Sequence, residues 1–219
     1  MLSKEILIKQ IPVIKSTDKG SLALSLMEEY GVKHLPVVDN GKYTCLLPEK
    51  DIFLMENIED HVKGICFFAP YVGEEAHILE VLRIMSNDKL TLLPVVDSEG
   101  NSIGGITLQN LIEKLSEITN AGSNGALIAI EIYQQDYDLL NIIRIVESNN
   151  SKVLSFFTYC LGDTGKLIIM LKIDSEDASA ILRSFERFNY NVAYYFQKHS
   201  LTDDIQHKRL EELMYYLQM

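Results

Sequence analysis

The stretch HLPVVDN, residues 34–40, returns almost unchanged as LLPVVDS, residues 92–98. The prolines of the two stretches, Pro36 and Pro94, lie 94 − 36 = 58 residues apart. Each stretch holds the unbroken apolar run LPVV, which is typical of a short strand buried on both faces. A buried strand that occurs twice in the sequence at a fixed spacing predicts two copies of one structural unit.

The flanks of both stretches also repeat, in the same register before the strands and after one inserted residue behind them. Met27 and Met85, which are 85 − 27 = 58 residues apart, hold the same place in helical apolar patterns before the two strands. Asn-Gly and Glu-Gly turn signals follow the strands, and a second strand and a helix follow each turn. We therefore predict repeats at about 11–53 and 68–112, each with a helix, two strands and a helix, packed together about a pseudo-two-fold axis.

This duplicated pattern carries a resemblance to a known family. A helix with a late methionine, LPVVD, a turn, and a strand leading into a helix start occur twice within residues 1–118. The arrangement resembles the tandem cystathionine-β-synthase (CBS) domain pair. The resemblance implies a regulatory module that binds adenine nucleotides or related ligands in clefts between the two repeats.

The composition limits the other classes of function. The chain has 219 residues, 47% of them hydrophobic, which allows one large domain or two modest ones. Its 31 acidic and 20 basic residues give a net charge of −11, which repels phosphate backbones and disfavours a nucleic-acid partner. No apolar stretch approaches the length of a membrane span, and the start MLSKEILIKQIPVI is interrupted by charges, so neither membrane insertion nor a signal peptide is expected.

The cysteines are odd in number and scattered. Cys45, Cys66 and Cys160 each lie in or beside an apolar run. We interpret them as buried free thiols in a reducing cytoplasm rather than as disulfide partners.

The second half of the chain shows a different pattern. Small polar residues end the apolar periodicity and predict a linker at 119–125. Residues 126–199 then show strand, helix, strand, strand, helix and strand patterns, the ferredoxin-like βαββαβ order. In this position the order resembles an ACT domain, and the whole chain resembles the acetoin-utilisation B-type proteins. The expected fold class is α+β (mixed α/β), with a last amphipathic helix at 200–219 that docks on its own domain or on a second subunit.

The ACT resemblance has one departure. The family places a glycine in the turn between its first strand and first helix, where the chain approaches a bound amino acid. Here QQDYDLL puts Asp138 or Leu139 at that position. A side chain and a negative charge there would obstruct an amino-acid carboxylate, which weighs against amino-acid binding.

The CBS resemblance also implies a ligand site. The family's strand-to-helix junction reads G-h-x-[ST]-x-x-[DN], and its hydroxyl and its carboxylate or amide can both reach a ribose. In the second repeat, GGITLQN places Gly104, Thr107 and Asn110 on this pattern. In the first repeat, CLLPEKD keeps only the acidic residue, Asp51, because a cysteine and a proline replace the glycine and the hydroxyl. The alternative is that Thr107 and Asn110 only cap a helix.

Three more positions follow from the same resemblance. His34 stands where the family often has a basic residue that meets a phosphate, and its alternative is a half-exposed strand histidine. Val72 and Pro94 belong to stretches that offer backbone contacts to an adenine ring, and their alternative is plain core. Few other basic residues surround the motifs, which favours adenosine or a singly phosphorylated nucleotide over ATP.

Motifs of catalysis are missing from the sequence. We find no G-x-S-x-G, H-E-x-x-H or phosphate loop, and the five histidines lack metal spacing. No catalytic residue and no metal site are therefore expected. The sequence favours a cytoplasmic, non-catalytic regulatory protein that senses AMP, adenosine or another adenine nucleotide and has an unidentified protein partner. The alternative is a ligand-free interaction scaffold with degenerate CBS and ACT sites.

The helices of the repeats predict a homodimer. Leu22, Leu24 and Leu26 cannot all face one side of a helix, because steps of two residues each turn it by about 200°. Helices that are apolar on two sides need a second surface to bury them. The sister repeat can cover part of it, and a second subunit would cover the rest.

Overall fold

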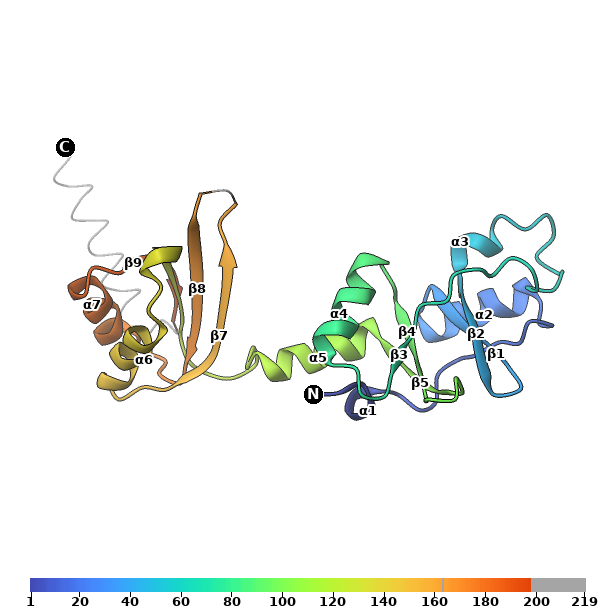
Figure 1. The fold of residues 1–219 in the computed structure, drawn as a ribbon, viewed down its shortest axis with the longest axis horizontal. Helices are drawn as coiled ribbons and strands as arrows, with labels where there is room; N and C mark the ends of the chain where they lie inside the picture. Colours follow the sequence, from blue (N-terminus) through green and yellow to red (C-terminus); the bar gives the residue numbers. More distant parts are fainter. Residues whose placement is uncertain (163, 198–219) are drawn as a thin grey trace, which may run out of the picture. The chain divides into compact units, whose positions relative to one another are not determined.

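The computed structural model describes residues 1–162 and 164–197 (Figure 1). The chain divides into two compact units, Met1–Leu115 and Ser116–Met219. The helix expected over residues 200–219 lies outside the described residues. Within the part that is described, no helix combines the length and the apolar character that a membrane crossing requires.

The first unit contains both repeats. Each repeat has the expected order of a helix, two antiparallel strands and a helix. The strands form a two-stranded sheet, β1-β2, and a three-stranded sheet, β3-β4-β5. The elements are α1 (Ser3–Ile6), α2 (Gly20–Tyr30), β1 (His34–Asp39), β2 (Lys42–Pro48), α3 (Glu49–Ile52), β3 (Val72–Gly73), α4 (Ile78–Asn87), β4 (Leu92–Val96), β5 (Ser102–Thr107) and α5 (Leu108–Ile118).

The two repeats share their register down to single residues. Val37 pairs with Cys45 in the first repeat, and Val95 pairs with Gly104 in the second. In both, the register shifts directly after this valine. Leucines of both repeats are fully buried in one cluster, so the apolar runs that repeat in the sequence build a common core.

Each repeat is also bonded to the segment that leads into the other repeat. Ile8 and Gly105 exchange two backbone hydrogen bonds, with N···O distances of 2.8 and 3.0 Å. In the first repeat, the Leu46 amide donates to the Phe68 carbonyl at 2.8 Å. The two repeats therefore cannot be separated without breaking backbone pairing.

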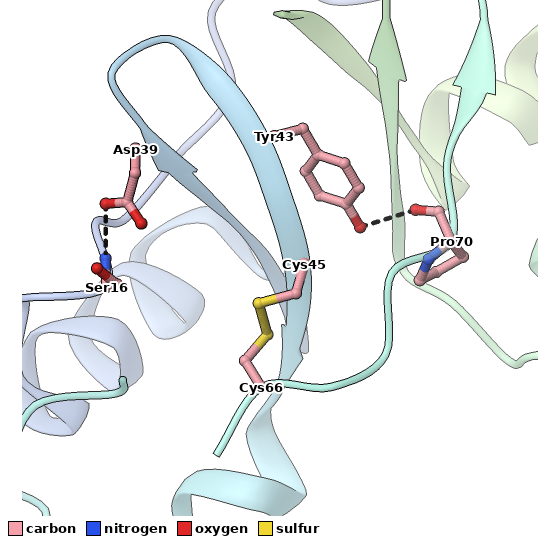
Figure 2. The surroundings of a disulfide bond; sticks show 6 residues. All are labelled: Ser16, Asp39, Tyr43, Cys45, Cys66 and Pro70. Carbon is pink, nitrogen blue, oxygen red and sulfur yellow. Dashed lines mark hydrogen bonds between the residues drawn. A yellow bond between two sulfur atoms is a disulfide. The ribbon is translucent and has the colours of Figure 1, made fainter. Parts of the chain in front are cut away.

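The aspartate of LPVVD accepts hydrogen bonds from nearby backbone amides in both repeats. Asp39 accepts a hydrogen bond from the Ser16 amide at 3.1 Å (Figure 2). Asp97 accepts from the amides of Glu99 and Asn101 at 2.9 and 2.8 Å, which closes the turn between β4 and β5. The Asn101 side chain and amide lower the pKa of Asp97, because they bond to the ionised carboxylate.

The described part of the second unit, up to residue 197, has one sheet and two α-helices. Its strands lie in the order β7-β8-β6-β9, and all neighbours are antiparallel. Both helices pack their buried residues against the sheet, and Figure 1 shows them on one side of it. The elements are β6 (Leu127–Tyr133), the 3-10 turn η1 (Gln134–Asp136), α6 (Leu139–Ser148), β7 (Val153–Cys160), β8 (Lys166–Ile173), α7 (Ser179–Arg187) and β9 (Asn191–Phe196).

Two details of the second unit bear on the sequence predictions. The Asp138 carboxylate accepts from the Asn141 amide at 3.1 Å, so Asp138, one of the two residues that could stand at the glycine position of an ACT domain, caps α6. The predicted linker 119–125 follows the end of α5. The Asn120 side chain donates to the Leu154 carbonyl at 3.0 Å, which ties the start of this stretch to β7.

The prediction of buried free thiols is wrong. Cys45 and Cys66 form a disulfide with Cα atoms 6.1 Å apart (Figure 2). The remaining thiol, Cys160, is free but exposed at the end of β7. The pairing arises because the segment before the second repeat crosses β2, a tertiary contact that the spacing of 21 residues does not reveal.

We predict that Gly104→Ala strongly destabilises the first unit. Gly104 has φ +148°, and a Cβ atom there would collide with the Ile8 carbonyl oxygen. The expected loss in free energy of unfolding is about 3 kcal/mol or more, combining the cost of a positive φ with overpacking. Gly100→Ala is the matched control, because Gly100 has φ +83° but open space around it. It should lose only about 1–2 kcal/mol in urea unfolding. Equal losses would contradict the crossing contact.

Candidate functional site

The starts of the central strands from both repeats meet at one place. Lys33 precedes β1 and Thr91 precedes β4, and the two are 91 − 33 = 58 residues apart. The Lys33 amide donates to the Thr91 hydroxyl at 2.8 Å, and His34 Nδ1 lies 3.1 Å from the same hydroxyl. This hydroxyl therefore joins the two repeats at the ends of their strands.

The first helical residue of each strand-to-helix junction is fixed in the same way. The Glu49 amide donates to the Lys33 carbonyl at 2.9 Å, and the Leu108 amide donates to the Thr91 carbonyl at 2.9 Å. These bonds place the starts of α3 and α5 beside the junction of the two repeats. The residues that the sequence singles out at the helix starts are thus brought near His34.

A hollow lies between the repeats at the second junction. Its volume is about 410 Å³, within the range of small-molecule sites. The first repeat supplies residues from the end of α2, and the second supplies Thr107 and the exposed side of α5. Its lining consists of Tyr30, Gly31, Val32, Thr91, Thr107, Leu108, Gln109, Ile112 and Glu113.

Thr107 and Asn110 show both of the roles that the sequence left open. The Thr107 hydroxyl accepts from the Asn110 amide at 3.2 Å, which caps the first turn of α5. The Asn110 side-chain oxygen, however, is buried and has no hydrogen-bond partner among the described residues. A buried acceptor without a donor costs about 1–3 kcal/mol. Asn110 itself does not line the hollow, so its side chain would have to turn toward the hollow to accept from a ligand hydroxyl.

The first junction is built differently. His34 pairs with Pro48 in the β1-β2 register, at the place where Leu92 pairs with Thr107 in the second repeat. Pro48 offers no side-chain cap, and α3 has only four residues. Asp51 is half-buried in this short helix. The first junction therefore has the carboxylate of the pattern but no hydroxyl beside it.

The other sequence-predicted residues lie together in the second sheet. Val72 pairs with Val95, which pairs with Gly104, and Pro94 pairs with Gly105. Val72, Pro94 and Gly104 are buried, and none of them lines the hollow. Their predicted role as backbone contacts to an adenine ring stays a prediction.

The protonation state of His34 determines whether it can form an ion pair with an anion or only a hydrogen bond. Burial lowers the pKa of His34 from its ordinary value of 6.5, and the nearby Lys50 lowers it further. The carboxylates of Glu49 and Asp51 oppose this shift but are the smaller effect. His34 is therefore neutral at pH 7 and can hydrogen-bond to a phosphate without neutralising it.

Sequence reasoning missed Lys33 and Thr91. The 58-residue register was the available signal, because it equates the two positions directly before the repeated strands. Neither residue belongs to the motif from which the site was predicted. As for metals, the described residues contain no group of three or more histidines, cysteines or carboxylates that could hold an ion.

Comparison with known proteins identifies the repeats. The family model of the CBS domain matches residues 3–55 and 68–117. Inosine-5'-monophosphate dehydrogenase from Methanocaldococcus jannaschii is 30% identical over 112 residues, which are 50% of this chain and 23% of the dehydrogenase. This match falls in the CBS region, and the chain spans only about a quarter of the dehydrogenase.

Two further proteins agree with this match. A CBS domain-containing protein from Dictyostelium discoideum is 27% identical over 135 residues, covering 54% of this chain and 93% of the relative. The solved structure of a CBS domain pair/ACT domain protein from Thermotoga maritima has a TM-score of 0.50 and 23% identity. It covers 53% of this chain and 98% of the solved one, so the likeness concerns the fold of about half of the chain.

We predict that His34 makes the first unit less stable in acid. Because its pKa is lowered on folding, the unfolded chain binds the proton more tightly, and stability falls as the pH drops below 6.5. His34→Gln keeps a hydrogen-bonding side chain but cannot titrate. The difference in free energy of unfolding between pH 7.5 and pH 5.5 should therefore be smaller in this variant. A His34 resonance that titrates above 6.5 in NMR would contradict the prediction.

Proposed function

We propose that the tandem CBS domain pair formed by residues 3–55 and 68–117, a regulatory type of module, binds AMP, adenosine or another adenine nucleotide at the second repeat. The observation that carries this proposal is the Asn110 side-chain oxygen. It is a buried acceptor without a donor, one turn from a threonine that lines a hollow between the repeats. A ribose hydroxyl matches both groups, since it can donate to the amide oxygen and accept from the Thr107 hydroxyl.

The charges around the hollow favour a ligand with few phosphates. His34 and Lys33 stand beside the Thr91 contact but do not line the hollow, and they offer it little positive charge: His34 is neutral at pH 7, and the Lys33 ammonium group lies 3.6 Å from the Glu49 carboxylate. Glu113 lines the hollow and would repel a phosphate. Together with a net charge of −11, these groups favour adenosine or AMP over ATP.

The proposal describes a non-catalytic, cytoplasmic regulator that acts as a homodimer. Apolar side chains on α2, α4 and α5 support the dimer, because Leu22, Leu79 and Ile112 are 46%, 60% and 58% exposed. Ligand binding between the repeats would change the angle between these helices, and the dimer would pass that change to a protein partner.

The second unit would complete the regulator as an ACT-like domain. Its βαββαβ order and its antiparallel sheet support this assignment on the ferredoxin-like arrangement. Because Asp138 caps α6 where an ACT domain has its glycine, we propose that this unit transmits the signal rather than binding an amino acid.

A scaffold that binds no ligand is the second candidate function. The first junction favours it, because Pro48 removes the hydroxyl of the pattern and α3 has only four residues. If the second junction also binds no ligand, the only role of the Thr107 hydroxyl is to cap α5. Binding of adenosine compounds separates the two candidates.

We predict that Thr107→Val weakens AMP binding by about 2- to 12-fold, the loss of one hydrogen bond worth about 0.5–1.5 kcal/mol. Thr107→Ser keeps the hydroxyl and should bind AMP nearly as well as the wild type. Asp51→Asn, at the first junction, should weaken AMP binding less than Thr107→Val does at the second. Isothermal titration calorimetry with AMP and with adenosine measures this. A larger effect of Asp51→Asn would put the site in the wrong repeat, and no heat with either compound would favour the scaffold.

We predict a homodimer with twice the chain mass of 24.9 kDa in light scattering at micromolar concentration. Leu79→Lys should shift the protein toward monomer, since it places a charge on the exposed apolar side of α4. Its neighbour Glu80→Lys is the matched control, because Glu80 is exposed and already polar. A wild-type protein that stays monomeric on concentration would rule out transmission through a dimer.

A further inference from the structure

We propose that the Cys45–Cys66 disulfide is a reversible thiol–disulfide site, through which the redox state of the cell controls the segment between the two repeats. This segment, residues 53–71, is here called the inter-repeat strap. It runs from the end of α3 to the start of β3 and contains no helix or strand of its own. The proposal does not depend on adenine-nucleotide binding.

The disulfide is one of few ties on the second half of the strap. The first half is held by backbone bonds, from Val62 to the Asp18 carbonyl at 2.9 Å and from Ser21 to the Ile58 carbonyl at 2.8 Å. The second half is held by the Phe68 carbonyl, which accepts from Leu46, and by two side-chain ties that Figure 2 shows. These are the disulfide itself and the Tyr43 hydroxyl, which donates to the Pro70 carbonyl at 2.9 Å.

The second repeat shows what the same contact looks like without a disulfide. There Gly104 lets the crossing segment come so close that Gly105 exchanges two backbone hydrogen bonds with Ile8. Cys45 occupies the position of Gly104, and the neighbouring Leu46 makes one backbone bond to the strap. At this crossing the first repeat thus has a disulfide, whereas the second repeat has two backbone hydrogen bonds. Of these two kinds of contact, only the disulfide can be broken by a reductant.

The two sulfurs differ in access. Cys45 is 5% exposed within β2, whereas Cys66 is half-buried on the strap. A small thiolate therefore attacks Cys66 Sγ, forms a mixed disulfide with it, and releases Cys45 as a thiolate that takes up a proton. A second thiol then attacks the mixed disulfide and frees the Cys66 thiol. In total, the disulfide gains two electrons and two protons, and two thiols become one small-molecule disulfide. A small disulfide reverses the reaction.

The bond fixes the position of an apolar surface. Phe67 and Phe68 follow Cys66 directly, and Phe67 is 85% exposed. Reduction removes the one covalent tie and leaves this part of the strap with hydrogen bonds to the Phe68 and Pro70 carbonyls, the Tyr43–Tyr71 ring contact and the packing of Ile65. This step rests on the cytoplasmic location proposed above, because disulfides that persist in a reducing compartment are usually redox-sensing or catalytic. Release of the strap is therefore the change that the bond can control.

Limited proteolysis of the full chain tests the proposal. The protein carries Cys160→Ser, which removes the exposed thiol of the second unit. It is purified without reductant and treated with chymotrypsin before and after dithiothreitol, and after reoxidation with oxidised glutathione. Alkylation and mass spectrometry count the free thiols at each stage. We expect no free thiol at first, faster cleavage after Phe67 and Phe68 on reduction, and recovery of resistance on reoxidation.

A variant without the bond provides the matched control. Cys66→Ser should be cleaved quickly at the same two sites whether or not dithiothreitol is present, with unchanged circular dichroism. Free Cys45 and Cys66 thiols in the untreated protein would overturn the proposal, as would cleavage that does not respond to reduction. Cooperative unfolding of the first unit on reduction would also overturn it, since the bond would then be a structural staple rather than a switch.

Discussion

The exchange of chain segments between the two repeats is the constraint on which the first unit depends. Ile8 leads into the first repeat but pairs with Gly105 of the second, and Phe68 leads into the second but pairs with Leu46 of the first. Neither repeat satisfies its backbone alone, and their leucines share one core. The hollow between the repeats and the central Thr91 contact both follow from this joint construction.

On this common frame the two repeats have diverged in chemistry. The second repeat keeps the glycine, the hydroxyl and an amide, and the amide oxygen is left without a donor. The first repeat has a cysteine at the glycine position and a proline at the hydroxyl position, and its cysteine is bonded to the strap. The same backbone register therefore supports the proposed ligand site in one repeat and a covalent tie in the other.

Much of the first unit follows from the sequence, because two apolar strands with similar turns, the second one residue longer, leave few ways to pair. The register, with Val37 opposite Cys45 and Val95 opposite Gly104, continues the repeat, with an offset of 58 residues before the turn and of 59 after it. The disulfide could not be predicted, because it depends on where the strap crosses β2, and residue spacing carries no information on that crossing. The unpartnered oxygen of Asn110 was hidden for the same reason, since burial of a single atom is set by packing.

The central claim is that the two repeats share one frame but only the second binds a ligand. Hydrogen–deuterium exchange with and without saturating AMP tests this most directly, because it follows both strand-to-helix junctions in one experiment. The account predicts slower exchange at Thr107–Asn110 and no change at Pro48–Asp51. Equal protection of both junctions, protection of the first alone, or no protection at either would contradict it.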